Sequence, residues 1–371
     1  MDFNFSDDQQ QLRDAVRRWV DKAYTFEHRR SAVQAGGFSG DTWTQLADLG
    51  LTALTVPETY GGMGLGFVDT MVVMEELGRG MVLEPLAQAY IASEVLTQYA
   101  PDAVKTQWLP RIATGESVVV LAHQERKSRY RLDQCTARAS KHGNSYTVLA
   151  HKSVVPVGDK ADAFLVPAVL EDRQALFLVE CTAEGVKTRG YGTQDGGRAA
   201  ELECQNSPAT LITTSGLEAL QLAVDVGSAC VCAEAVGAME QTLLITADYL
   251  NQRKQFGVAI SSFQALRHRI ADMKMQLELA RSMSYYANLQ VRQPAESRHR
   301  AISRARVQLG QSMRFVGQQA VQLHGGIGIT DEYIISHFFK KLTQLEMTYG
   351  DSLHHLGEVS AHMQDTAGVM E

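Results

Sequence analysis

The chain has 371 residues and a mass of 40.8 kDa, with 45% hydrophobic and 21% charged residues. This composition is ordinary for a globular protein, and the length predicts two or three domains. The net charge of −7 and the pI near 5.9 argue against a nucleic-acid-binding surface, so no nucleic-acid partner is expected.

Cysteine usage and the N-terminus bear on the compartment. The five cysteines form no C-x-x-C pair and leave one over, which favours a reduced, cytoplasmic location, and no metal site is expected. The first residues, MDFNFSDDQQQLRD, show neither the basic nor the apolar segment of a signal peptide. No apolar run reaches the ~18 residues of a membrane span, so none is expected.

Residues 1–116 predict an N-terminal helical domain. Ser6 and Gln9 have the spacing of a capping box, and an apolar stripe of helical period follows them at Leu12, Val16, Trp19, Val20 and Ala23. Further helices are expected at 41–49, 67–77 and 85–99, the last opened by a proline. A glycine-rich loop, TVPETYGGMGLG, lies among them at 55–66.

From about Ser117 the pattern changes from helical to alternating. Short β-branched runs such as SVVVLAH, SYTVLAHKSVVPV and ALFLVECT are separated by turn residues. Strands in a block, with helical segments only before and after it, predict an antiparallel β-domain at 117–216 rather than a parallel sheet. No G-x-G-x-x-G follows a strand, so a Rossmann dinucleotide fingerprint is absent.

Residues 217–371 return to a helical pattern and predict a C-terminal four-helix bundle. Small residues are dense around 227–250, which allows close helix packing, and a long amphipathic helix runs from about Ile302 to Leu323. The segment 253–273, RKQFGVAISSFQALRHRIADM, predicts a helix, a turn and a second helix. The apolar face of that second helix comprises Phe263, Leu266, Ile270, Met273 and Leu277.

Two motifs in this last region resemble the signature of the acyl-CoA dehydrogenase flavoprotein family. One is Arg253-x-Gln255-Phe256-Gly257, followed by Phe263-Gln264, and the other is Gln322-x-x-Gly325-Gly326. Taken alone, the first is consistent with a plain helical hairpin and the second with a helix C-cap. Together, in this order, they extend the resemblance over essentially the whole chain, and the loop at 55–66 is similar to another family segment.

The resemblance implies a fold, a cofactor and site residues. The fold is α+β, with an N-terminal helical domain, a middle antiparallel β-domain and a C-terminal four-helix bundle. FAD is then expected between the β-domain and the C-terminal helices, with the pyrophosphate contacted across a subunit interface. The cofactor-binding candidates are Arg253, Gln255, Phe256, Gln264, Gln322, Gly325 and Gly326, joined on the β-domain by His123 and Gln124.

The family's catalytic base is missing from its usual places. The glutamate of a Tyr-Glu-Gly-Thr sequence, which removes the α-proton of the thioester, falls on Tyr349 or Gly350, and the alternative position falls on Gly227. Asp351 and Glu346 are the remaining carboxylates nearby, and Asp351 is the candidate base. A structural acid in a turn is an equally good interpretation of Asp351.

The flavin face of the β-domain departs from the family as well. Gln124 replaces a threonine, the Gly-Ser-Asp turn after it becomes Arg126-Lys127-Ser128-Arg129-Tyr130-Arg131, and Lys-x-Trp-Ile-Thr becomes residues 152–156, KSVVP. This set of changes resembles the small subunits of heteromeric acyl-CoA dehydrogenases, such as that of pimeloyl-CoA dehydrogenase.

Three functions therefore stay open. The first is FAD-dependent α,β-dehydrogenation of an acyl-CoA thioester, either alone through Asp351 or with a base from a partner subunit. The second is a flavin-dependent monooxygenase, for which His354 and His355 are the relevant side chains. The third is a silent subunit that only completes an FAD interface. Expected partners are an acyl-CoA, an electron-transfer acceptor protein, and a second copy or a related large subunit, in a homodimer or heterotetramer.

Overall fold

The structure, a computed structural model, describes residues 5–363. Its contacts divide the chain into two compact units, each assembled from separate stretches of sequence. Among the described residues, the helical unit comprises 5–29, 67–82 and 228–363, and the sheet unit comprises 30–66 and 83–227. The N-terminal helices are thus shared between the two units, because α1 packs on α4 and α4 packs against α8 of the C-terminal region.

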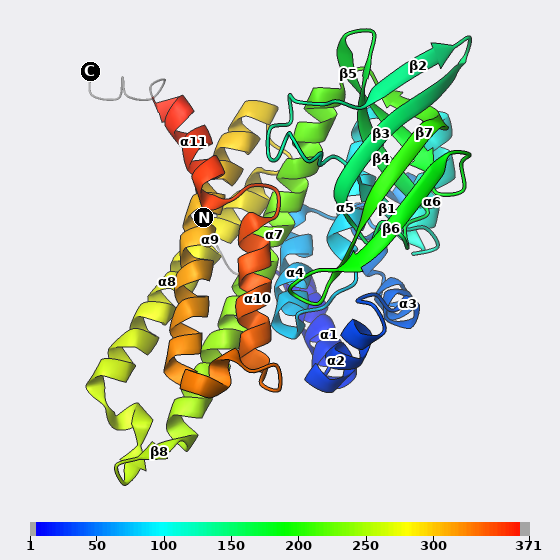
Figure 1. Cartoon of the computed structure of the whole chain (residues 1–371). Coiled ribbons are helices and arrows are strands. Elements are labelled where there is room, and N and C mark those ends of the chain that lie inside the picture. Colours follow the sequence, from blue (N-terminus) through cyan, green and yellow to red (C-terminus); the bar gives the residue numbers. More distant parts are fainter. Residues whose placement is uncertain (1–4, 364–371) are drawn as a thin grey trace. The chain divides into compact units, whose positions relative to one another are not determined.

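The helical unit is built on long helices that run side by side (Figure 1). The capping box predicted at the start of α1 is confirmed, since Ser6 and Gln9 exchange side-chain and backbone hydrogen bonds. A short hairpin of β8 (Lys254–Gln255) and β9 (Val258–Ala259) joins α7 to α8. The helices are α1 (Asp7–Ala23), α4 (Phe67–Gly80), most of α7 (Gly216–Gln252), α8 (Gln264–Gln290), α9 (Ala295–His324), α10 (Ile334–Met347) and α11 (Ser352–Met363), and α2 (Phe26–Gln34) starts here.

Helices α4 and α7 cross in backbone contact. A Cβ on Gly78 would lie 2.0 Å from the carbonyl oxygen of Glu234, and one on Gly237 would lie 1.7 Å from that of Glu75. Both distances are too short for any side chain, so the crossing needs glycine on both helices. The close packing predicted from the small residues of 227–250 is confirmed at this crossing.

Helix α7 bears on the expectation that no segment spans a membrane. Within residues 5–363 it is the one helix that is long and apolar enough to cross a membrane. However, 94% of its most apolar stretch is buried inside the protein. The apolar residues of α7 therefore behave as those of a core helix, which passes the same length and composition test.

The sheet unit carries the β-strands and three further helices. Its helices are α3 (Gly40–Asp48), α5 (Leu86–Tyr99) and α6 (Asp102–Ala113), with short 3₁₀ turns at Leu51–Ala53 and Glu58–Tyr60. The helices predicted at 41–49, 67–77 and 85–99 are thus found within a few residues, and α6 was not predicted. The strands are β1 (Val119–Leu121), β2 (Arg138–His142), β3 (Ser145–Pro156), β4 (Ala163–Leu170), β5 (Arg173–Glu180), β6 (Val186–Gly192) and β7 (Arg198–Thr213).

The sheet is largely antiparallel, as predicted. Its strand order is β1-β4-β2-β3-β7-β5, with β6 on β7 and an additional β4–β5 pairing that closes the ring. The exceptions are parallel pairings of β4 with β1 and, at a single residue pair, with β2. The paired strands β4 and β5 bury Phe164 and Phe177 completely, which gives this unit its own apolar core.

Candidate functional site

The predicted turn after Arg253 is a two-residue β-hairpin. Gln255 pairs with Val258, and the two residues between them, Phe256 and Gly257, have φ angles of 53° and 81°. Positive φ at both central positions defines a type I′ turn, where asparagine and glycine are the usual residues. Phe256 is unusual at such a position and is 91% exposed. The chain therefore holds a large aromatic ring in solvent on a strained backbone.

Arg253 has a fixed backbone and an exposed side chain. Its N–H donates to the carbonyl of Tyr249 at 2.8 Å, and its carbonyl accepts from Ile260 at 2.9 Å. Within residues 5–363 the guanidinium makes no ion pair or hydrogen bond. Gln264, the first residue of α8, is likewise exposed. A guanidinium held at a defined place with its donors unused suits an anion supplied from outside the chain.

The Gly325-Gly326 segment follows directly on the end of α9. Gly325 has φ 64° and ψ −140°, a combination that only glycine adopts without strain. Nothing lies within 4 Å of where a Cβ would stand on Gly325 or Gly326. Gln322, in the last turn of α9, is exposed beside them. This end of α9 therefore presents bare backbone with open space in front of it.

The structure brings these two predicted motifs together through Tyr249 and His324. The Tyr249 ring, one turn before Arg253, stacks on His324 with 4.4 Å between ring centroids. The Tyr249 hydroxyl also donates to the His324 carbonyl at 3.3 Å. Burial lowers the pKa of His324 against the opposing effect of its hydrogen bond to Ala320, so the ring is neutral at pH 7. Neither aromatic residue was predicted to belong to the site.

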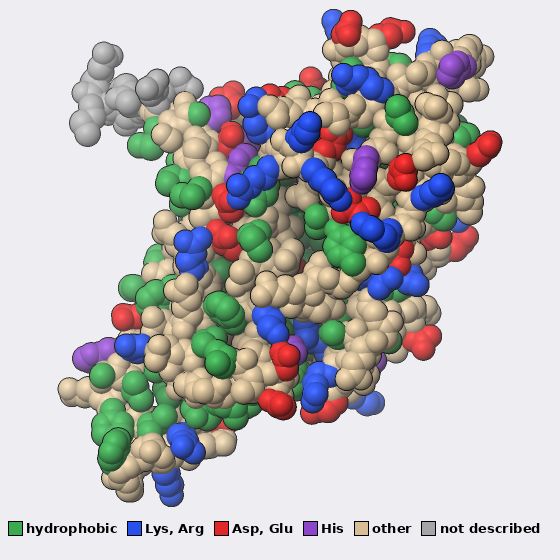
Figure 2. All heavy atoms as spheres, viewed as in Figure 1, with side chains coloured by type: hydrophobic (Ala, Val, Ile, Leu, Met, Phe, Trp, Pro, Cys, Tyr) green, Lys and Arg blue, Asp and Glu red, His purple; other side chains and the backbone are tan. Residues whose placement is uncertain are grey.

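Apolar side chains are exposed around this part of the helical unit. The space-filling view shows them gathered at the β8 end of the long helices (Figure 2). Of the predicted apolar face of α8, Met273 and Leu277 are buried, whereas Phe263 is 39% exposed. Such a patch marks a surface that another molecule covers. The exposed residues here are Phe256, Val258, Phe263, Ile327 and Ile329.

The α10–α11 loop, which carries the candidate base, is held from several sides. Arg306 of α9 is 2% exposed, and its Nη2 lies 2.8–3.1 Å from four backbone carbonyl oxygens, those of Leu345, Glu346, Thr348 and Gly350. Gly350 has φ 125°, and a Cβ there would lie 2.6 Å from the ring of His354. The loop thus has little freedom to move.

Both carboxylates near the usual base position have structural partners. Asp351 precedes α11, and its Oδ1 accepts from the backbone N–H of His354 at 2.8 Å, the arrangement of a helix N-cap. Glu346 Oε1 accepts from the hydroxyl of Ser352 at 2.6 Å and from its N–H at 3.0 Å, and it pairs with Arg314 at 3.3 Å. Each carboxylate stabilises the local backbone.

Of the paired histidines, His354 is half-buried and His355 faces its own helix bundle. His355 is 2% exposed, and its ring lies 3.5 Å from the hydroxyl of Ser303 and 3.5 Å from Nε of Arg306. Burial and the Arg306 charge lower the pKa of His355 well below the ordinary value, so it is neutral at pH 7. A ring packed in this way against α9 is not placed to face a flavin or a substrate.

On the sheet unit, His123 and Gln124 lead into a buried ion pair that was not predicted. The Nζ of Lys152 donates to Glu125 Oε1 at 2.7 Å, and both side chains are almost completely buried. Glu125 also accepts from the N–H groups of Thr136 at 2.7 Å and Ala137 at 3.1 Å. Burial alone would raise the pKa of Glu125, but Lys152 and these hydrogen bonds lower it to about 2.

His123 shares the field of this ion pair. Burial, together with the Lys152 charge, lowers the pKa of His123 to about 3, so it is neutral at pH 7. The carbonyl of Gln124 accepts from the N–H of Ser153 at 2.9 Å, which joins this segment to β3. The sequence carried one signal for the pair, since charged residues inside apolar strands are buried only with a partner.

The end of β3, where the resemblance predicts a flavin-facing surface, is irregular. The register with β7 shifts between Lys152 and Val155, and Val154 has φ 54° while being 44% exposed. The Ser153 hydroxyl donates to Glu201 at 3.0 Å. The hydroxyl of Ser153 is therefore already engaged by a protein partner.

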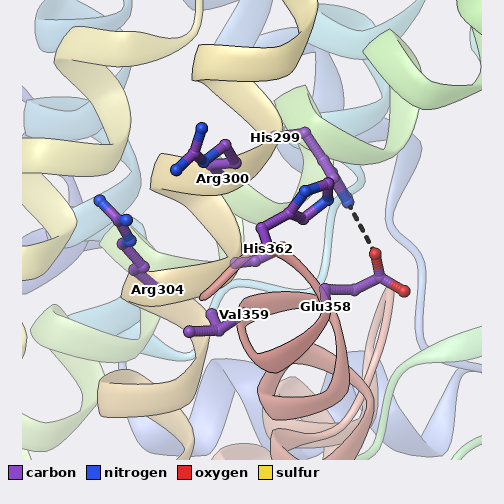
Figure 3. Close-up of a pocket in the computed structure, with 7 residues that line it drawn as sticks. His299, Arg300, Arg304, Glu358, Val359 and His362 are labelled. Carbon is purple, nitrogen blue, oxygen red and sulfur yellow. Dashed lines mark hydrogen bonds and ion pairs between the residues drawn. The ribbon is translucent and has the colours of Figure 1, made fainter. Parts of the chain in front are cut away.

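A small pocket lies between α9 and α11 (Figure 3). It holds about 10 Å³, enough for one water molecule and too little for an acyl chain. His299 and Glu358 pair across it at 3.5 Å. The pocket therefore belongs to the packing of α11 against α9. Its lining residues are His299, Arg300, Ser303, Arg304, Glu358, Val359 and His362.

Comparison with known families and proteins identifies relatives over the full length. Residues 6–116 match the acyl-CoA dehydrogenase N-terminal domain and residues 214–363 match the acyl-CoA dehydrogenase C-terminal domain, which together make up more than half of the chain. Acyl-CoA dehydrogenase FadE27 of Mycobacterium tuberculosis is 25% identical, over 99% of this chain and 100% of that protein. Probable acyl-CoA dehydrogenase YngJ of Bacillus subtilis is 26% identical, over 95% and 97%.

Solved structures of acyl-CoA dehydrogenases also resemble this chain over nearly its full length. A variant of the Tcur3481-Tcur3483 steroid ACAD superposes with a TM-score of 0.90 at 26% identity, over 97% of this chain and 99% of that one. The ChsE4-ChsE5 complex from Mycobacterium tuberculosis gives a TM-score of 0.91 at 24% identity, over 98% and 99%, which supports the fold.

Proposed function

The chain belongs to the acyl-CoA dehydrogenase family, and we propose that it works as a subunit whose catalytic carboxylate is supplied by a related partner. Members of this family are oxidoreductases that act on CH–CH groups of acyl-CoA thioesters, and FAD is the cofactor. The resemblance to pimeloyl-CoA dehydrogenase small subunits, and the two components named in the Tcur3481-Tcur3483 steroid ACAD, support a heteromeric assembly.

The helical unit fits the pyrophosphate of FAD. Gly325 and Gly326 leave open space where side chains would block an approaching phosphate, and Arg253 has its donors unused within the described residues. Bare backbone and a fixed guanidinium are what a phosphate pair requires. Because Arg253 and the exposed apolar residues around it face outward, we infer that the FAD they contact is bound together with a second subunit.

The observation that carries the proposal is the state of Asp351. FAD, when bound, would supply the hydride acceptor for the β-carbon of the thioester, and the protein must supply a carboxylate that removes the α-proton. That carboxylate needs an oxygen within hydrogen-bond reach of the carbon. Asp351 instead caps α11 through His354, and Glu346 is bound to Ser352 and Arg314. Neither side chain can turn toward a substrate without losing a contact that holds the loop.

Three further expectations concern the electron acceptor, the compartment and the monooxygenase alternative. An electron-transfer protein is still expected to reoxidise the flavin, and the free state of all five cysteines fits a reducing cytoplasm. The monooxygenase alternative depended on His354 and His355. Because His355 is buried against α9, no observation favours that alternative.

The test is reduction of bound flavin by a panel of acyl-CoA thioesters, followed in the visible spectrum. Four preparations are compared: the chain and its Asp351→Asn variant, each alone and each co-expressed with a glutamate-bearing family subunit from the same genome. We expect bleaching only in the two co-expressed preparations, and to the same extent in both. Bleaching by the chain alone that disappears in Asp351→Asn would instead identify Asp351 as the base.

A further inference from the structure

The loop that replaces the family's Gly-Ser-Asp turn is strongly cationic. It carries Arg126, Lys127, Arg129 and Arg131, with no acidic residue among 126–132, in a chain whose net charge is −7. The side chains of Arg126 and Arg131 are 71% and 64% exposed. Lys and Arg side chains are numerous on the face of the sheet unit shown in Figure 2. We refer to residues 126–131 as the cationic loop.

The cationic loop is held in a defined shape. Its first neighbour, Glu125, is fixed by Lys152 at 2.7 Å and by the backbone of Thr136 at 2.7 Å. Successive turns follow, in which Ser128 N–H donates to the carbonyl of Glu125 at 3.2 Å and Arg131 N–H donates to that of Ser128 at 2.9 Å. An ordered loop presents its charges at fixed places and loses little entropy when a ligand binds.

The cations are only partly neutralised within the unit. Arg131 pairs with Asp133 at 2.8 Å, and Arg126 lies 3.6 Å from Glu201, a carboxylate that already pairs with His151 at 3.1 Å. Arg129, with φ 48°, stacks over the ring of Tyr130. No carboxylate among residues 5–363 pairs with Lys127. The loop thus keeps an excess of positive charge near β3 and β7.

We propose that the cationic loop binds the phosphate groups of coenzyme A in an acyl-CoA. The inference rests on the proposed function in taking an acyl-CoA as the ligand. The loop starts two residues after Gln124 and reaches Glu201 beside Ser153, the edge that the resemblance assigns to the flavin. Coenzyme A carries its phosphates at the end remote from the thioester, and guanidinium and ammonium groups are the side chains that bind phosphate.

The experiment measures binding of coenzyme A, 3′-dephospho-coenzyme A and pantetheine to the flavin-loaded full chain by calorimetry, at low and at high salt. The loop variant is R126Q/K127Q/R131Q, which leaves the strained Arg129 in place. The matched control, K141Q/K187Q/R189Q, removes the same charge from exposed positions on β2 and β6 of the same unit. Melting curves of both variants check that the sheet unit still folds.

We expect the loop variant to bind coenzyme A about tenfold or more weakly than wild type, and the control to stay within about twofold. Pantetheine, which lacks the phosphates, should bind wild type and loop variant equally. The loss with 3′-dephospho-coenzyme A shows whether the 3′-phosphate is among the groups bound. High salt should reduce the difference between wild type and loop variant.

Two outcomes would overturn the inference. Equal binding of coenzyme A by the loop variant and the control would show that the loop is not part of the site, as would a loop variant that loses affinity for pantetheine and coenzyme A alike. A wild type that binds no coenzyme A at all would contradict both this inference and the proposed function. If wild type binds coenzyme A and the loop variant binds it equally well, the inference fails and the proposed function stands.

Discussion

Two ends of the helical unit illustrate opposite ways of building a loop. At the β8–β9 hairpin and Gly325-Gly326, the chain leaves donors unused, glycine backbone bare and Phe256 in solvent. At the α10–α11 loop, Arg306, Glu346 and Asp351 each bind backbone or side-chain groups of the loop itself. The hairpin and Gly325-Gly326 therefore have the properties of a surface that binds a ligand and a partner. The α10–α11 loop has the properties of a structural support.

The largest expected effect is a loss of stability when the α10–α11 loop is disturbed. Arg306→Met removes a buried cation that binds four carbonyl oxygens, and we expect it to lower the free energy of unfolding by about 3–5 kcal/mol. Arg304→Met, two residues away on the same helix but exposed, should change it by no more than about 0.5 kcal/mol. Urea denaturation of both variants measures the difference. Equal stability of the two variants would mean that Arg306 does not hold the loop.

At the β8–β9 hairpin we expect the opposite: a substitution should change flavin binding and leave stability nearly unaffected. Arg253→Ala removes an exposed side chain, so stability should change by about 0.5 kcal/mol or less. Flavin affinity should fall about tenfold to a hundredfold, because a charge-assisted contact to phosphate is lost. Arg269→Ala, an exposed arginine of α8, is the control. Flavin titration followed by fluorescence quenching decides, and an unchanged affinity would remove Arg253 from the cofactor site.

Asp351 separates a capping role from a catalytic one. Asparagine caps a helix as well as aspartate does, so Asp351→Asn should preserve stability, whereas Asp351→Ala should lower it by about 1 kcal/mol. Thermal melting of both variants tests this. Equal melting temperatures for the alanine and asparagine variants would show that the capping contact contributes nothing, and the case for a partner-supplied base would weaken.

Phe256 gives the smallest expected change. Asparagine tolerates a positive φ better than phenylalanine does, so Phe256→Asn should raise the stability of the isolated chain by about 0.5–1 kcal/mol. The same change should weaken assembly, because it removes an exposed aromatic ring. Phe256→Leu keeps the strain and much of the apolar surface. Melting curves and light scattering of both variants show whether strain and assembly are linked at this position.

Periodicity and turn residues predicted much of the fold. The helices at 41–49, 67–77 and 85–99 were predicted from the spacing of apolar residues, and the block of strands from the alternation of apolar and polar residues. Both patterns can be read within a few neighbouring residues. The β8–β9 hairpin was missed as such, since phenylalanine is a poor residue for a type I′ turn. The packing of α4 against α7 and α8 depends on contacts between segments far apart in the sequence, and no local pattern predicts such contacts.

The residues of the candidate site likewise fall into those predicted from local motifs and those that depend on distant contacts. Arg253, Gln322 and Gly325-Gly326 were predicted from motifs, and the structure joins them through Tyr249 and His324, residues without a motif of their own. Arg306 and Lys152 were not predicted, because a buried cation is distinguished from an exposed one only by partners far away in sequence. Asp351 was predicted from its position, and its capping contact became visible only once the start of α11 was known.

The discontinuous helical unit also has a consequence for synthesis on the ribosome. Residues 30–66 and 83–227 can complete the sheet unit before the rest of the helical unit has been made. Helix α4, with Gly78 shaped to receive α7, must wait until Gly237 and Glu234 emerge from the exit tunnel. Its apolar surface stays uncovered during that interval, a period in which nascent chains depend on chaperones. Synonymous codon changes that slow translation just after residue 227 should therefore reduce the soluble yield of this protein.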